Sequence, residues 1–175
     1  MSNRIETVEV FPLGIPRDVP YLGPLGSGVT VNEKGCFVRP GNRTVYSVAD
    51  HSVLLKLTTS AGAAGWGECV SVVAPQVVAA IIRDLVGPLL VGRDPLDSTV
   101  IHEDLYDAMR VRGYFGGFYL DALSAVDIAL WDLRGKLAGL PVCRMLGGVR
   151  HQRIPAYISG LPASTLEERV ALAVQ

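Results

Sequence analysis

Hydrophobic and polar positions in the first half of the chain follow the pattern of β-strands. Segment 5–15 is rich in β-branched and aromatic residues and runs into Pro16, which is typical of a strand that enters a loop. Two more strand-like runs cover 51–60 and 66–72, and the glycines between them suit a hairpin turn. The pattern predicts a three-stranded meander.

The second half of the chain shows helical spacing. One helix is predicted to begin at Pro75 and to stop at Gly87-Pro88. Asp94 is placed to cap a second helix, which runs from Pro95 to about residue 112. The strongest pattern predicts a third helix over about 121–137, whose apolar residues fall on one arc: Leu123, Val126, Leu130, Leu133 and Leu137.

Residues 16–44 form the longest segment without a regular pattern, and they are rich in glycine and proline. A loop of this length is usually functional or disordered. We therefore treat it as a candidate lid. Three of its side chains are candidates for contact with a ligand: Tyr21, Leu22 and Val29. Each of them either lines a ligand pocket or packs locally within the loop.

Charge and cysteine content narrow the class of partner. The formal net charge is -1, which gives no attraction for nucleic acid or anionic lipid, so a small-molecule partner is expected. The three cysteines have no paired spacing and the start of the sequence lacks an apolar leader. We expect a cytoplasmic protein without a membrane segment.

Residues 122–148, ALSAVDIALWDLRGKLAGLPVCRMLGG, resemble the signature of the mandelate racemase and muconate lactonizing enzyme group within the enolase superfamily. Met145 departs from the signature, where leucine is usual. The order of strand, long loop, hairpin ending in GWGE at 65–68, and helices is similar to that of the family as well. The resemblance therefore covers the whole chain.

The resemblance implies an α+β N-terminal capping domain, a three-stranded meander plus helices, over residues 1–148. Residues 149–175 would then be the first strand and helix of a truncated (β/α) barrel. A short strand is predicted over 154–159, followed by a helix with a capping box formed by Ser164 or Thr165 and Glu167 or Glu168.

Family chemistry is the abstraction of a proton next to a carboxylate, with Mg²⁺ stabilising the enediolate. The resemblance implies a dehydratase, racemase or cycloisomerase that acts on a hydroxy acid or acid sugar, and a homo-oligomer. Because the family's metal ligands and catalytic bases lie on later barrel strands, no residue of this chain is expected to be catalytic or to bind metal. We expect this chain alone to be inactive, with the missing barrel as its partner.

By the same resemblance, the two loops that close over the substrate are 16–44 and the segment just after Glu68. The Glu68 carboxylate either faces the substrate or ties down neighbouring backbone amides. Ser159, at the end of the predicted barrel strand, is a further candidate for substrate binding. Cys69 is not expected to be a nucleophile.

The signature carboxylates Asp127 and Asp132 are expected to have structural roles, because they lie on a helix and not at the ends of barrel strands. Asp132 is four residues before Lys136, which favours an ion pair on the helix surface.

An alternative stays open: a standalone noncatalytic binding or interaction module derived from this domain. Against it, we expect the apolar arc of the third helix to need a covering surface that the barrel supplies.

Overall fold

The computed structural model describes residues 3–157, 161, 163 and 165–174. The chain forms two compact units, each described by itself below. The first comprises residues 1–13 and 52–150, and the second comprises 14–51 and 151–175.

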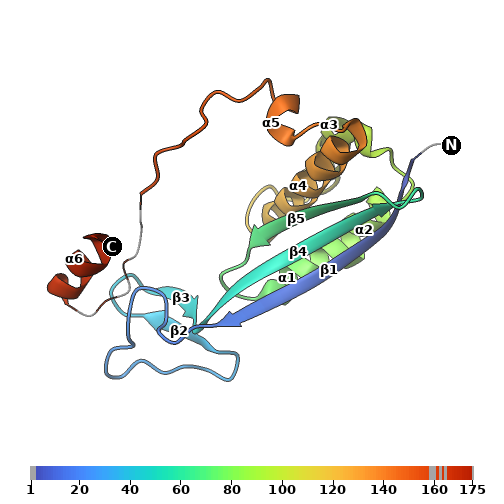
Figure 1. The fold of residues 1–175 in the computed structure, drawn as a ribbon. Coiled ribbons are helices and arrows are strands. Elements are labelled where there is room, and N and C mark those ends of the chain that lie inside the picture. The colour runs from blue at the N-terminus through green and yellow to red at the C-terminus, as the bar shows by residue number, and fades with distance from the viewer. Residues whose placement is uncertain (1–2, 158–160, 162, 164, 175) are drawn as a thin grey trace. The chain divides into compact units, whose positions relative to one another are not determined.

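A three-stranded sheet runs in the order β1-β4-β5 (Figure 1). Its strands are β1 (Ile5–Pro16), β4 (Ala49–Thr59) and β5 (Ala64–Val70). Strands β4 and β5 are antiparallel, in a register that places Ser52 opposite Val70 and Thr58 opposite Ala64. Gly62 in the connecting turn has a φ of 84°, which glycine adopts without steric cost. The predicted meander is confirmed.

The first helical segment is longer than predicted. It consists of α1 (Pro75–Ala80), the π-helix η1 (Ile81–Val86) and α2 (Gly87–Leu90). The predicted stop at Gly87-Pro88 is wrong, because the Gly87 amide donates to the Ile82 carbonyl, five residues back. This wider turn accommodates an extra residue just before Pro88, whose ring would clash in a regular α-helix.

The next two helices agree with the sequence prediction. The 3₁₀-helix η2 (Pro95–Asp97) leads into α3 (Ser98–Arg110), and an Asp94 carboxylate oxygen accepts from the Leu96 amide at 3.0 Å. The cap is thus confirmed. Helix α4 (Phe118–Ala138) covers the predicted 121–137 and ends at Gly139, whose φ of 65° is the usual left-handed cap. The short α5 (Val142–Met145) follows.

The core of the first unit surrounds α4, which packs against β5, α1, η1 and α3 (Figure 1). The expectation that the apolar arc of this helix needs an external covering surface is wrong, because these elements already bury it. The side chains of the arc that are at most 2% exposed are Leu123, Val126, Leu130 and Leu133.

Strand β5 and helix α4 touch through their backbones. A Cβ atom added at Gly67 would lie 1.9 Å from the Ala125 carbonyl oxygen, and one added at Gly65 would lie 2.3 Å from the Ala129 carbonyl oxygen. Any side chain at either glycine would therefore push strand and helix apart. The two glycines of the GWG sequence are therefore required for this close packing.

The last part of the chain agrees with the prediction only partly. Residues 154–157 form no strand, and residue 159 lies outside the described residues. A strand needs a hydrogen-bonded neighbour, and none pairs with 154–157 among the described residues.

Helix α6 (Leu166–Val174) does form. Its capping box is confirmed for Thr165 and Glu168, whose side chains and amides bond reciprocally at 3.1 and 3.2 Å. Ser164 lies outside the described residues. The domain boundary between residues 148 and 149 stays a prediction.

Among the described residues, no single helix has the length and apolar character needed to cross a membrane. Segments Pro75–Leu90 and Pro95–Arg110 reach that length and composition only together, with a bend of 119° between them.

Candidate substrate lid and carboxylate site

The candidate lid contains its own hairpin. Strand β2 (Cys36–Arg39) pairs with β3 (Thr44–Ser47) in antiparallel register, with Phe37 opposite Tyr46 (Figure 1). The predicted irregular segment 16–44 is therefore shorter than its sequence pattern indicates. Short strands of four residues give too weak an alternation to detect among so many glycines and prolines.

A small aromatic cluster packs inside the second unit, which contains the candidate lid. Phe37 is 2% exposed, and its ring centroid lies 6.1 Å from that of Tyr46, which in turn lies 6.1 Å from that of Tyr21. The Arg17 guanidinium lies over the Tyr21 ring at 5.8 Å and binds both carboxylate oxygens of Asp50 at 2.8 Å. Tyr21 thus packs locally, yet it remains 38% exposed.

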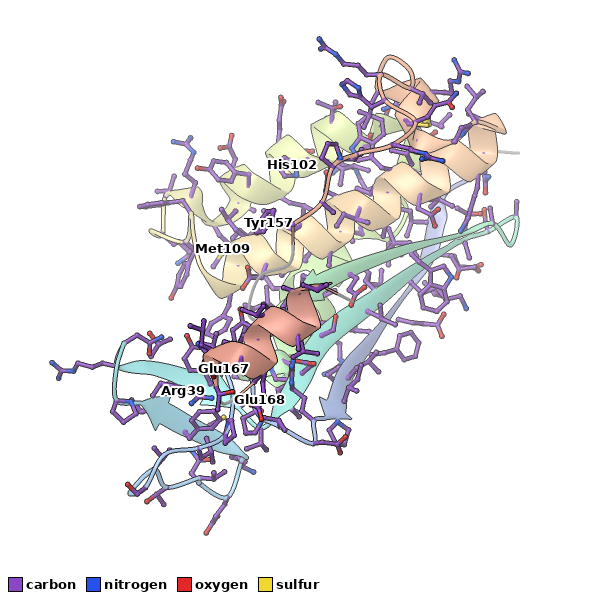
Figure 2. All side chains as sticks on the ribbon, turned by 60° about the vertical axis from the view of Figure 1, so that its left-hand side comes forward. Arg39, His102, Met109, Tyr157, Glu167 and Glu168 are labelled. Atoms are coloured by element: carbon purple, nitrogen blue, oxygen red, sulfur yellow. The ribbon has the colours of Figure 1, made fainter. Side chains whose placement is uncertain are left out.

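Arg39, labelled in Figure 2, lies at the end of β2 and binds residues 21–24, which we call the tip of the candidate lid. Its Nη2 atom donates to the carbonyl oxygens of Tyr21 and Gly23 at 2.6 Å each, and its Nη1 atom donates to the carbonyl of Pro24 at 3.2 Å. We call these three bonds the Arg39 clamp. Sequence reasoning missed it because the acceptors are main-chain carbonyls, which every residue carries.

Leu22 lies in the middle of this clamp with a φ of 69°. The left-handed region costs a non-glycine residue roughly 1–2 kcal/mol, and such strain gathers at functional sites. Gly23 continues the turn with a φ of 99°, and its amide donates to the Pro20 carbonyl at 3.0 Å. The Leu22 side chain is 42% exposed, so the tip presents an apolar group to solvent.

Val29 is half-buried and lies in a separate turn, where its amide donates to the Gly26 carbonyl at 3.3 Å. Ser159, the candidate after the predicted barrel strand, lies outside the described residues.

Glu68 belongs to the first unit, on the exposed side of β5. Its carboxylate accepts a hydrogen bond from the Ser52 hydroxyl, which also lies 3.1 Å from the Cys69 carbonyl oxygen. A hydroxyl has one proton, so Ser52 donates to one acceptor at a time. This contact joins β4 to β5 and favours an anchoring role through a side chain instead of through backbone amides.

The neighbouring Cys69 thiol is buried. Burial raises its pKa to about 11, and the charges of Asp121 and Glu68 act in the same direction. A thiol that stays protonated at neutral pH is a poor nucleophile. The electrostatics therefore agree with a structural role for this cysteine.

The predicted ion pair of Asp132 and Lys136 is confirmed, with 2.6 Å between the charged atoms. Both side chains also bind the outer edge of β5. Asp132 accepts from the Trp66 amide at 2.8 Å, and Lys136 donates to the Ala64 carbonyl at 3.0 Å. These signature residues thus satisfy backbone groups of an edge strand, which would otherwise be open to pairing.

The Oδ1 atom of Asp127, on α4, lies 3.8 Å from the Nδ1 atom of His102, on α3; Figure 2 labels His102. An open pocket of about 260 Å³ lies at the end of α4, but its two charged residues are already paired with each other: Asp132 and Lys136.

In the described part of the chain, no three His, Cys, Asp or Glu side chains lie close enough together to hold a metal ion.

Comparisons with known proteins agree with this architecture. The sequence model of the mandelate racemase / muconate lactonizing enzyme N-terminal domain matches residues 27–147. The crystal structure of a member of the enolase superfamily from Agrobacterium tumefaciens superimposes with a TM-score of 0.92 at 55% identity. That comparison covers 99% of this chain and 44% of the other.

Two curated relatives carry names that state an activity. A D-galactonate dehydratase family member from Streptomyces bingchenggensis is 40% identical over 113 residues, which is 65% of this chain and 27% of the relative. The D-galactarolactone cycloisomerase of Agrobacterium fabrum is 39% identical over 108 residues, 62% of this chain and 28% of the relative. The chain therefore spans less than half of each of these proteins.

A solved relative carries a metal. The mandelate racemase/muconate lactonizing protein from Paracoccus denitrificans, complexed with magnesium, superimposes with a TM-score of 0.57 at 33% identity. The match covers 60% of this chain and 28% of that protein.

Proposed function

The chain belongs to the mandelate racemase / muconate lactonizing enzyme N-terminal domain family of the enolase superfamily, and on this premise we propose that it forms the substrate lid of an acid-sugar enzyme. The complete enzyme removes a proton next to a carboxylate, as a dehydratase, racemase or cycloisomerase. The observation that carries the proposal is the lid tip, which Arg39 binds through three carbonyl groups and which presents the exposed side chain of Leu22.

The lid contributes apolar contacts to this site. Its candidate side chains are Tyr21, Leu22 and Val29, which suit the C–H faces of an acid sugar and not its carboxylate. Two cations beside the tip are already engaged, since Arg17 binds Asp50 and Arg39 binds three carbonyl oxygens. We place the binding of the substrate carboxylate in another part of the complete enzyme.

We also place metal binding in another part of the complete enzyme. A proton next to a carboxylate is very weakly acidic, so its removal needs a positioned base and a cation that stabilises the developing charge. The described residues of this chain do not fit Mg²⁺, because no three ligand side chains converge. We propose that the barrel of the complete enzyme supplies the magnesium ligands, the base and the residues that distinguish the possible reactions.

A chimera tests the proposal. This chain replaces the corresponding 44% of the Agrobacterium tumefaciens enolase-superfamily protein, and Mg²⁺-dependent turnover of a panel of acid sugars is measured. We expect turnover by the chimera, with the unmodified protein as control. We expect no exchange of a substrate α-proton in D₂O with the 175-residue chain alone. A folded chimera that is inert towards the control's substrates would contradict the proposal, and so would exchange by the chain alone.

The standalone binding module remains a second candidate, because the apolar arc of α4 is covered by the chain's own elements. The DNA downstream of the coding segment separates the two. A continuing reading frame with a lysine motif and spaced acidic residues supports the enzyme, and a native stop without them supports the module.

A further inference from the structure

The tip of the lid, residues 21–24, combines strain with a fixed conformation. Leu22 occupies the left-handed region without the freedom of glycine, while Gly23 beside it is buried. One local bond, from the Gly23 amide to the Pro20 carbonyl, closes the turn. A strained non-glycine conformation persists only where surrounding contacts fix it, and the Arg39 clamp supplies such contacts.

The chemistry of arginine suits this task. A guanidinium is planar, permanently charged and carries five N–H donors in a fixed geometry, so one side chain binds several carbonyl oxygens at once. Arg39 binds the carbonyls on both sides of Leu22, those of Tyr21 and Gly23. Its own position is fixed by β2, where it pairs with Thr44, and by the Phe37 ring, 5.4 Å from the guanidinium carbon.

We propose that Arg39 is a positioning residue for substrate selection, which holds the lid tip in the conformation that presents the Leu22 side chain. The inference rests on the proposed function as a substrate lid and adds the residue that gives the lid its shape. Arg39 itself does not touch the substrate. It acts through the carbonyl groups of the tip, so its loss changes which acid sugars are accepted.

Amide hydrogen exchange on the full 175-residue chain tests the positioning. In Arg39→Met, we expect the Gly23 amide to exchange at least about tenfold faster, because the tip opens locally. The Val48 amide, which donates to the Gly35 carbonyl in the same unit, should keep its protection. The matched control is Arg43→Met, which removes the same charge at an exposed site without a side-chain hydrogen bond among the described residues. The Arg43 amide donates to the Arg39 carbonyl at 2.8 Å, and this backbone bond is available in both variants. Unchanged exchange at Gly23 in Arg39→Met would overturn the proposal.

A more conservative variant covers the case in which Arg39→Met unfolds the hairpin, seen as lost protection at Val48. Arg39→Lys keeps the charge but cannot reproduce the fork of donors. Its Gly23 amide must then exchange faster than in the wild type while the Val48 amide stays protected, and equal exchange at Gly23 refutes the clamp.

Selectivity is measured in the chimera, as the ratio of kcat/KM for D-galactonate to kcat/KM for D-galactarolactone. We expect Arg39→Met and Leu22→Ala to shift this ratio in the same direction, by about tenfold, and Arg43→Met to leave it unchanged. Equal losses for both substrates overturn the role in selection while the proposed function stands. If the chimera converts neither substrate, the proposed function fails for these acid sugars, and Gly23 exchange decides whether Arg39 positions the tip.

Discussion

Replacement of Gly67 by alanine probes the backbone contact between β5 and α4. The new Cβ atom would lie 1.9 Å from the Ala125 carbonyl oxygen and 2.7 Å from the Ala129 amide nitrogen, whereas real Cβ atoms essentially never come closer than 3.0 Å. Both obstacles are backbone atoms of a long helix, so no side-chain rotation relieves the overlap. Strand and helix must separate by about 1 Å or more.

The expected loss of stability is large for a single methyl group. Overpacking in a core costs about 1–3 kcal/mol and occasionally more. A gap of up to about 1 Å also forfeits a quarter to a half of the dispersion energy of each contact that it opens. Leu130 and Leu133, both fully buried, lie on the affected helix. We therefore expect Gly67→Ala to lower the free energy of unfolding by about 3 kcal/mol or more.

Urea unfolding followed by circular dichroism measures this loss. The matched control is Gly116→Ala, where the added Cβ meets nothing within 4 Å and φ is outside the left-handed region; we expect a change of no more than about 0.5 kcal/mol. Because the clash involves the backbone of Ala125, the second change Ala125→Gly should not restore stability. A loss below about 1 kcal/mol in Gly67→Ala, or rescue by Ala125→Gly, would refute the reasoning.

Four further predictions concern other parts of the first unit. Asp132→Ala should lower the free energy of unfolding in urea by about 1–2 kcal/mol, because the Trp66 amide loses its acceptor. Asp132→Asn keeps an acceptor oxygen and should lower it less, and equal losses in the two variants would contradict the reasoning. At pH 8, iodoacetamide should modify the exposed Cys143 and spare Cys69. Because the folded Cys69 thiol keeps its proton longer than the unfolded one, the free energy of unfolding should fall as pH rises from 9.0 to about 11, and a Cys69→Ala variant should lack this contribution. Asp94→Ala should cost about 1 kcal/mol through loss of the helix cap, and unchanged stability would argue against the cap.

The sequence predicted the elements whose signals are local. The meander, the Asp94 cap, the extent of α4 and the Thr165 capping box all depend on residues within a few positions of one another. The sequence-based prediction failed at Pro88, where a π turn accommodates the proline. It also failed at 154–157, which pair with no strand among the described residues. Both errors have the same cause. The sequence pattern reports a residue's preference for a regular helix or strand, whereas the observed structure depends on the local backbone geometry and on whether a partner strand is present.

For the candidate site, the sequence by itself determined that 16–44 is a lid candidate with apolar side chains, and its signature residues indicated the family. Only the tertiary structure decided how the tip is held. The Arg39 clamp joins residues 15 to 18 positions apart, and the bond from Asp132 to the Trp66 amide joins residues 66 positions apart. These acceptors and donors are backbone groups that every residue carries, so the residue types do not reveal the pairing, and only the folded chain selects which of them meet.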